Sequence, residues 1–275
     1  MKITVLSENT TRGPKVTPEF GLSLHIACGS QSILFDSGSS DNFARNARVL
    51  GIDLARVDMA VLSHGHFDHS NGFGAFMALN DHAPIYAHEG FDGEYFKGND
   101  EYIGIAPELK GNDRFEAVDG IRELGEGLKL LSYDSVTALH PIVSEDMLVK
   151  DGDEMKPDVF AHEHYLLVCE GDVRLLVTGC SHKGIANIMH WAKTEQVTHV
   201  IGGFHLMGVQ PGDYAKLDAL ADELLGYDAM YYTGHCTGIE PYEAMKKLMG
   251  DKLHYVHSGD EIRIRTGIRE GNGIG

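Results

Sequence analysis

The chain has 275 residues, of which 43% are hydrophobic, so it can bury the core of one large α/β domain or of two small ones. Its 23 Lys and Arg residues are outnumbered by 41 Asp and Glu residues, which gives a formal net charge of −18. A surface this acidic repels nucleic acid and anionic membranes, and we expect neither as a partner.

The chain begins with a short apolar run at residues 3–6, which ends in the polar residues Ser7-Glu8-Asn9. This run is too short for the core of a signal peptide, and no later stretch approaches the roughly 20 apolar residues of a membrane span. Four cysteines are scattered without a CxxC pair: Cys28, Cys169, Cys180 and Cys236. We therefore expect a cytoplasmic protein with neither a zinc ribbon nor a dense disulfide framework.

Short β-rich runs recur along the chain, with helical patterns between several of them. Strands are predicted at 3–6, 22–27, 33–35, 57–62, 128–131, 165–169, 173–177, 197–201 and 229–232, and helices at 41–50, 72–79, 185–194, 214–225 and 241–249. The early strands follow one another as hairpins before the first helix, and strands and helices then alternate. This order predicts one α/β domain over residues 1–275, built as a four-layer αββα sandwich of two mixed sheets.

Residues 89–119 interrupt this alternation of strands and helices. They are rich in Gly, Asn, Asp and Glu, with the aromatic residues Phe91, Tyr95, Phe96, Tyr102 and Phe115 between them. We interpret this segment as an insertion near the functional site. A lid over the substrate and a plain surface loop both agree with its composition.

The densest group of potential ligands follows the strand predicted at 57–62. It is His64-Gly65-His66-Phe67-Asp68-His69, three imidazoles and one carboxylate within six residues. Residues two apart in an extended segment point the same way, so His64 and His66 can reach one ion while Asp68 and His69 offer a second pair. Imidazole nitrogen and carboxylate oxygen suit zinc, iron and manganese. The motif predicts two adjoining divalent ions, zinc in the first place, with iron or manganese as alternatives.

Three later segments share one form, an apolar strand that is followed by glycine and a histidine. These histidines are His182, His205 and His235. Side chains at strand ends converge at one edge of a sheet, where α/β proteins place their sites. We expect His182 and His235 to ligate the metals, whereas His205 can either ligate or hydrogen-bond to the substrate. Cys180 stays open between a soft or bridging metal ligand and a small buried thiol.

Two further segments carry candidate residues. Asp36 ends the strand at 33–35 and could accept a hydrogen bond from the N–H of a ligating imidazole, or could serve in a plain turn. His162-Glu163-His164 precedes the strand at 165–169 and has the spacing of a ligand pair, although a surface position fits equally well. Within it, Glu163 could orient a ligand or transfer a proton.

The stretch from Ser63 to His69, preceded by Phe35-Asp36-Ser37-Gly38, resembles the HxHxDH signature of the metallo-β-lactamase superfamily. Within that superfamily, Thr178-Gly179-Cys180-Ser181-His182, Gly202-Gly203-Phe204-His205 and Gly234-His235-Cys236 look similar to one subgroup. That subgroup contains dihydropterin ribofuranosylaminobenzene phosphate synthases and many bacterial hydrolase-like proteins. The resemblance covers nearly the whole chain, and it is more specific for the fold than for the substrate.

The resemblance implies two sets of metal ligands: His64, His66 and His182 for one ion, and Asp68, His69 and His235 for the other. The chain departs from the family pattern at Cys180, where many members place a bridging Asp. In addition, the loop histidine that usually ligates before that strand has only the 162–164 segment as its counterpart. We therefore expect His182 to supply the missing imidazole.

Two divalent ions favour hydrolysis of a small, anionic ester or phosphoester by a water that they activate to hydroxide. We expect Asp68 to steer this nucleophile as well as to ligate, and His205 and Glu163 are candidates to protonate the leaving group or bind an oxyanion. The resemblance implies an alternative, a synthase that joins a pterin diphosphate to an arylamine ribosyl phosphate. A non-catalytic, metal-bound ligand sensor is a third interpretation.

Overall fold

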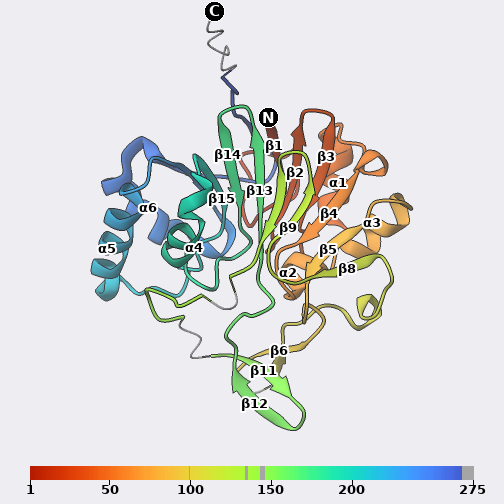
Figure 1. Ribbon diagram of the computed structural model, residues 1–275, viewed down its shortest axis with the longest axis horizontal. Coiled ribbons are helices and arrows are strands. Elements are labelled where there is room, and N and C mark those ends of the chain that lie inside the picture. Colours follow the sequence, from red (N-terminus) through yellow and green to blue (C-terminus); the bar gives the residue numbers. More distant parts are fainter. Residues whose placement is uncertain (99, 134–135, 143–145, 268–275) are drawn as a thin grey trace, which may run out of the picture.

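Two seven-stranded sheets pack face to face in the computed structural model, which describes residues 1–98, 100–133, 136–142 and 146–267. Helices cover the outer face of each sheet, so four layers follow one another as α, β, β and α (Figure 1). The αββα sandwich predicted from the order of elements is confirmed.

The first sheet is built mainly from the N-terminal half of the chain. Across the sheet, its strands are β18 (Glu261–Arg263), β1 (Lys2–Ser7), β2 (Ser23–Cys28), β3 (Gln31–Phe35), β4 (Met59–Leu62), β5 (Ile85–His88) and β8 (Phe115–Val118). The strands from β18 to β3 are antiparallel, and those from β3 to β8 are parallel. Helices α1 (Asn42–Val49) and α3 (Phe73–Leu79) lie on the outer side of this sheet (Figure 1).

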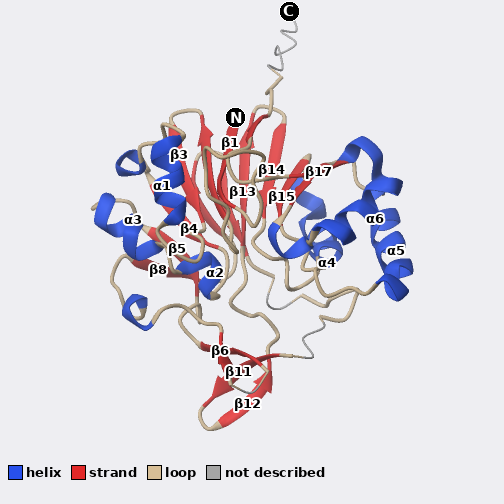
Figure 2. Cartoon of the chain, turned by 180° about the vertical axis from the view of Figure 1, so that it is seen from behind, coloured by secondary structure: helices blue, strands red, loops and turns tan. Residues whose placement is uncertain are grey.

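The second sheet comes from the C-terminal half, with the order β17 (Leu253–Tyr255), β16 (Met230–Thr233), β15 (His199–Gly202), β14 (Val173–Val177), β13 (Tyr165–Glu170), β10 (Leu128–Leu131) and β9 (Arg122–Gly125). Strands β14 to β17 are parallel, and the others are antiparallel. Helices α4 (Ile185–Trp191), α5 (Tyr214–Leu225) and α6 (Ile239–Met249) cover its outer face (Figure 2). Each sheet thus contributes a parallel half.

Alternation of side chains along the strands explains the layers. In β3, Ile33 and Phe35 enter the core between the sheets, while Leu34 enters the core under α1 and α3. In β14, Leu175 also faces the other sheet, whereas Leu176 packs under α4 to α6. Because successive side chains of a strand point to opposite faces, a strand that is covered on both faces must be apolar throughout. This is why these runs were recognisable as strands.

A small third sheet projects from one end of the sandwich, at the bottom of Figure 1. It has the order β12 (Glu154–Pro157), β11 (Met147–Asp151), β6 (Glu94–Lys97) and β7 (Glu101–Tyr102). Strands β6 and β7 come from the insertion expected at 89–119, but β8, within the same range, belongs to the first main sheet. The hairpin of β11 and β12, which was not predicted, completes the projection.

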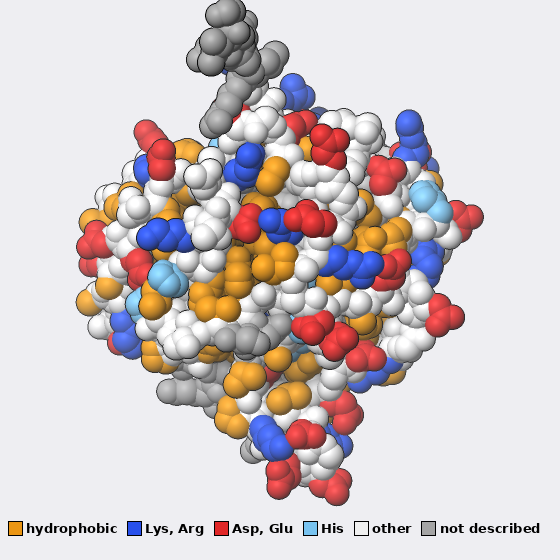
Figure 3. All heavy atoms as spheres, viewed as in Figure 1, with side chains coloured by type: hydrophobic (Ala, Val, Ile, Leu, Met, Phe, Trp, Pro, Cys, Tyr) orange, Lys and Arg blue, Asp and Glu red, His pale blue; other side chains and the backbone are white. Residues whose placement is uncertain are grey.

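The remaining elements are short. One turn of helix, α2 (Phe67–Ser70), follows β4, and 3-10 turns lie at Leu54–Arg56, Pro107–Leu109, Ala192–Glu195, Pro211–Asp213, His235–Thr237 and Gly250–Lys252. Among the described helices, none has the length and apolar character that crossing a membrane requires. On the face seen in Figure 3, Asp and Glu side chains lie among Lys and Arg side chains.

Candidate metal centre

Five parallel strands end at one edge of the sandwich, and each is followed by a loop that carries a candidate residue. Asp36 follows β3 and His64 follows β4 in the first sheet, while His182, His205 and His235 follow β14, β15 and β16 in the second. The carboxyl ends of parallel strands are the usual place for sites in α/β proteins. The structure thus brings the residues expected from the sequence to one place.

The loop after β4 holds four candidate ligands, all of them buried: His64, His66, Asp68 and His69. The backbone bends at His64 and Gly65 and is extended at His66, which caps α2, so Asp68 and His69 lie in the single turn of that helix. Gly65 allows this path because a Cβ atom there would lie 2.0 Å from the carbonyl oxygen of Phe91. No other residue fits at this position without moving the backbone.

The first cluster consists of His64, His66 and His182, whose ring nitrogens lie within 4.8 Å of one another. The hydroxyl of Ser63 donates to Asp36 at 2.7 Å, so it must accept the Nδ1–H of His64 at 2.8 Å. The Nε2 of His64 therefore presents a lone pair, 3.3 Å from the Nε2 of His182. The Nε2 of His66 is buried without a hydrogen-bond partner among the described residues.

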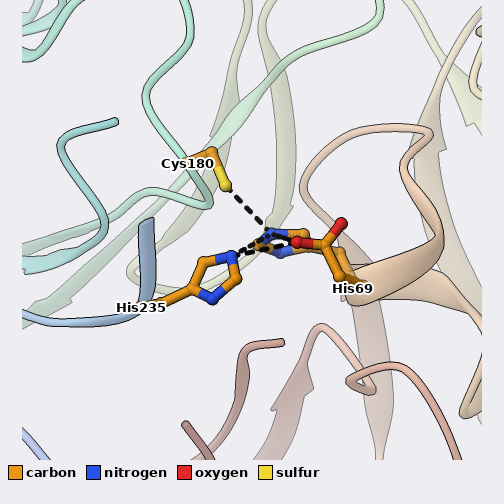
Figure 4. A group of neighbouring side chains, drawn as sticks. His69, Cys180 and His235 are labelled. Atoms are coloured by element: carbon orange, nitrogen blue, oxygen red, sulfur yellow. Dashed lines mark hydrogen bonds and ion pairs between the residues drawn. The ribbon is translucent and has the colours of Figure 1, made fainter. Parts of the chain in front are cut away.

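The second cluster consists of Asp68, His69, Cys180 and His235. The Nε2 of His69 lies 3.1 Å from the Sγ of Cys180 and 3.2 Å from the Nε2 of His235. An oxygen of Asp68 lies 3.1 Å from the same nitrogen of His235. Figure 4 shows Cys180 and His235 reaching towards His69 from separate loops of the second sheet.

Hydrogen bonds behind the second cluster fix where its protons lie. His69 donates its Nδ1–H to Asp36 at 2.6 Å, as expected for Asp36, and His235 donates its Nδ1–H to the Oδ1 of Asn9 at 2.9 Å. The amide of Asn9 is oriented by Gly21, whose N–H donates to the same Oδ1. In the neutral form of each ring, both Nε2 atoms therefore carry lone pairs, only 3.2 Å apart and next to a carboxylate. Facing lone pairs of this kind fit a cation between them.

Charges in the two clusters differ. Burial opposes the charged form of His69, but the carboxylates of Asp68 and Asp36 outweigh burial and raise the pKa of His69 to about 9. In the first cluster, burial and the neighbouring His162 lower the pKa of His66 to about 3. The second cluster thus attracts positive charge, while the first presents neutral imidazoles, the form that binds metals.

A buried glutamate holds the loop of His182. Glu163 is fully buried, and its Oε1 accepts the backbone N–H of His182 at 2.7 Å. Its Oε2 accepts the backbone N–H of Lys183 at 3.0 Å and the hydroxyl of Tyr165 at 2.8 Å. Ser181, at the start of this loop, has a positive φ of 57°. The carboxylate predicted to orient a ligand or to transfer a proton thus accepts hydrogen bonds from the backbone of the ligand loop.

A second buried glutamate does the same for the loop of His235. The Oε1 of Glu8 accepts the backbone N–H of His235 at 2.7 Å and the hydroxyl of Tyr255 at 3.0 Å. Its Oε2 accepts from the backbone and the hydroxyl of Thr10. His235 also has a positive φ, 51°. Sequence reasoning missed Glu8 because a glutamate directly after a strand looks like the polar end of that strand.

The segment 162–164 lies inside the molecule rather than on its surface. His162 accepts the N–H of Gly65 at its Nδ1 and donates its Nε2–H to Asp158, so both ring nitrogens have protein partners. Tyr95, from β6 of the small sheet, stacks on the ring of His162 at a centroid distance of 3.9 Å. His164 donates its Nε2–H to the carbonyl of Leu62. These histidines support the first loop from behind.

His205 is the exposed member of the group. Its ring centroid lies 4.3 Å from that of His182, so it borders the first cluster. The next two backbone N–H groups, of Leu206 and Met207, both donate to the carbonyl of Cys236 and tie this loop to the loop of His235. His205 is therefore placed to meet a molecule that enters from solvent.

The model of the metallo-beta-lactamase superfamily matches residues 16–182, more than half of the chain. This stretch includes the first loop, Glu163 and His182. The chain belongs to the metallo-beta-lactamase superfamily. The resemblance noted from the sequence is thereby confirmed, and the match spans the first cluster together with Asp68, His69 and Cys180 of the second, whereas His235 lies beyond it.

Two proteins of Methanocaldococcus jannaschii are similar to this superfamily member over most of their length. One is an uncharacterised protein, 29% identical over 95% of this chain and 100% of its own. The other is 7,8-dihydropterin-6-methyl-4-(beta-D-ribofuranosyl)-aminobenzene-5'-phosphate synthase, 27% identical over 90% of each chain. Both alignments are long enough to reach beyond the stretch that the family model covers.

Among solved structures, Tm1679, a metal-dependent hydrolase of the beta-lactamase superfamily, matches with a TM-score of 0.77 and 25% identity. The match covers 96% of this chain and 99% of that chain. Zn(2+)-bound PqqB from Methylobacterium extorquens matches with a TM-score of 0.58 and 14% identity, over 96% of this chain and 100% of that chain. The second likeness shows the fold alone.

Proposed function

We propose that this chain is a dinuclear metal-dependent hydrolase that acts on a small, anionic ester or phosphoester. The observation that carries the proposal is the pair of neighbouring clusters whose lone pairs face one another. The two clusters adjoin each other, because the ring centroids of His64 and His69 are 4.2 Å apart. The likeness to Tm1679, a metal-dependent hydrolase, supports the same reaction class.

In this proposal His64, His66 and His182 hold one ion, and Asp68, His69 and His235 hold the other. Two divalent ions held about 3.5 to 4 Å apart would polarise a carbonyl or phosphoryl oxygen and lower the pKa of a water molecule. Imidazole and carboxylate ligands, with the Cys180 thiol at 3.1 Å from His69, favour zinc over harder ions. Iron or manganese fits the same nitrogen and oxygen donors.

Three residues receive roles beyond ligation. Asp68 orients the attacking water, since its carboxylate belongs to the second cluster and lies 3.1 Å from the Nε2 of His235. The exposed His205 protonates the leaving group or binds an oxyanion at the entrance. We place Glu163 outside proton transfer, because both of its oxygens accept hydrogen bonds from the loop of His182 and from Tyr165. Its role in this proposal is to position that loop.

A synthase is the second candidate. The synthase of Methanocaldococcus jannaschii is 27% identical over 90% of this chain, a span that exceeds the family match. On this alternative the same ions would bind the diphosphate of a pterin and promote its displacement by an arylamine ribosyl phosphate.

The two reactions can be separated in one experiment. The protein is loaded with zinc, manganese or iron and incubated either with aryl and alkyl phosphoesters and carboxylic esters, or with a pterin diphosphate and an arylamine ribosyl phosphate. Release of alcohol from the esters supports the hydrolase, and a joined product supports the synthase. Tight binding of these molecules without turnover under all three metals would contradict both and favour the sensor.

A further inference from the structure

Aromatic side chains enclose the two clusters differently. Over the first cluster, Phe160 stacks on His182 with a centroid distance of 4.4 Å and an interplanar angle of 13°, and Tyr95 lies 5.8 Å from His66. Phe160 and Tyr95 are 1% and 4% exposed. Over the second cluster, Phe20 lies 5.0 Å from His235, but it is 49% exposed. The aromatic side chains beside the first cluster are therefore buried, whereas Phe20, beside the second cluster, is half exposed.

The open ring of Phe20 is carried on a fixed backbone. The N–H of Glu19 donates to the carbonyl of Glu8 at 3.0 Å, and the N–H of Gly21 donates to Asn9 at 3.2 Å. Gly21 has a φ of +148°, and a Cβ atom there would lie 2.5 Å from the carbonyl oxygen of Asp68. Since Glu8 and Asn9 also hold His235, the same residues fix Phe20 and the ligand beside it.

Other apolar side chains lie near Phe20 or near the loop of His235. Phe67, half-buried in α2, lies 6.5 Å from Phe20 with nearly parallel rings, at 26°. Near Gly238, in the loop that follows His235, Met207 and Ile239 are 49% and 44% exposed. The Cα of Met207 would lie 3.3 Å from a Cβ placed on Gly238, next to Ile239. A cluster of polar ligands with exposed apolar side chains nearby suits a molecule that has an anionic group and a flat apolar body.

We propose that Phe20 is a specificity-determining residue that stacks on a planar ring of the substrate while the anionic group of the substrate lies at the second cluster. This proposal rests on the proposed function and adds a substrate class: esters or phosphoesters with an aryl or heteroaryl group, in preference to alkyl ones. Stacking on one aromatic ring strengthens binding about threefold to tenfold. A rigid, pre-positioned ring gains this binding without being ordered first.

The test measures equilibrium binding rather than turnover. Phenylphosphonate and methylphosphonate, which are not hydrolysed, are titrated calorimetrically into zinc-loaded protein, and zinc content is measured in every sample. The natural protein should bind phenylphosphonate at least about threefold more tightly than methylphosphonate. Phe20→Ala should remove this preference and leave the dissociation constant of methylphosphonate and the zinc content unchanged. Phe20→Tyr should keep the preference, whereas Phe20→Leu, which is apolar without a flat ring, should keep little of it.

Val159 provides the matched control, because it is 64% exposed and precedes Phe160 at the first cluster. Val159→Ala should leave the preference for phenylphosphonate intact. Equal binding of the two probes to the natural protein, or full preference in Phe20→Ala, would overturn the role of Phe20 while leaving the anion site standing. If neither probe binds to zinc-loaded protein, the anion site itself is absent, and the proposed function fails with it.

Discussion

The loop after β4 and the loops after β14 and β16 bring ligands to the same place by different means. Four donors lie within six residues of the first loop, two of them before α2 and two within its single turn. The two later loops carry one histidine each. Their backbones are held by buried carboxylates, Glu163 for His182 and Glu8 for His235.

The loops differ in how far away in the sequence the residues that hold them lie. Glu8 is 227 residues away from His235 in the sequence, and it joins the end of β1 in the first sheet to the end of β16 in the second. His235 has a positive φ, which costs free energy in a residue other than glycine, and the hydrogen bond to Glu8 helps to offset this cost. The first loop is held by other groups, since Asp36 accepts the backbone N–H of Ser63 and His162 accepts that of Gly65. Changes to Glu8 and Glu163 should therefore affect the later loops selectively.

The largest effect should come from removing a ligand from the first loop or from one of the later loops. His66→Ala should lose the first ion and His235→Ala the second, and each should lower activity by more than roughly a hundredfold, the upper end of the effect of removing a group behind a ligand. Metal content by elemental analysis should fall from two ions to about one per chain. His190→Ala, in an exposed position of α4, should change neither quantity. Full metal content in His235→Ala would show that the second cluster does not hold an ion through His235.

The next largest effect should separate the two glutamates. Glu8→Gln should weaken binding of the second ion, and Glu163→Gln binding of the first, each about tenfold to a hundredfold. Cobalt titration followed by absorption spectroscopy reports the two sites separately. Glu261→Gln, at an exposed position of β18, is the matched control and should bind as the natural protein does. Equal loss at both sites in either variant would show general damage to the fold rather than control of one loop.

A smaller effect is expected behind the first loop. His162→Ala leaves the buried N–H of Gly65 without its acceptor, so the free energy of unfolding should fall by about 1–3 kcal/mol. Both of its nitrogens bond to protein groups, so at saturating zinc the metal content should stay at two ions. Denaturant unfolding and elemental analysis measure the two quantities. Loss of one ion at saturating zinc would show that His162 is a ligand and would contradict its role as a support of the first loop.

Much of this site could be predicted because its ligands obey local patterns. An apolar strand followed by glycine and histidine predicts where His182 and His235 lie, and alternation in the first loop predicts that His64 and His66 point together. The consecutive apolar residues 33–35 of β3 and 175–177 of β14 are recognisable as strands because both faces of the sheet are covered there. The short strands β5 and β8 were not predicted, since four residues beside a loop carry little periodicity.

The residues behind the ligands could not be predicted in the same way. Glu8 and Asn9 follow a strand, and nothing in that position distinguishes a buried acceptor from a polar turn. Their importance arises only when β1 and β16 come together at the edge of the two sheets. The position of Glu163 near the site was predicted, but its hydrogen-bond partners were not. They are backbone N–H groups, which the sequence does not mark.

The central claim is that two groups of lone pairs, one in each cluster, hold two cations side by side. Anomalous diffraction from crystals grown with zinc tests it most directly. We expect two zinc peaks about 3.5 to 4 Å apart, one bound by His64, His66 and His182, the other by Asp68, His69 and His235. A single peak, or rings of His182 and His235 turned away from the zinc, would contradict the account.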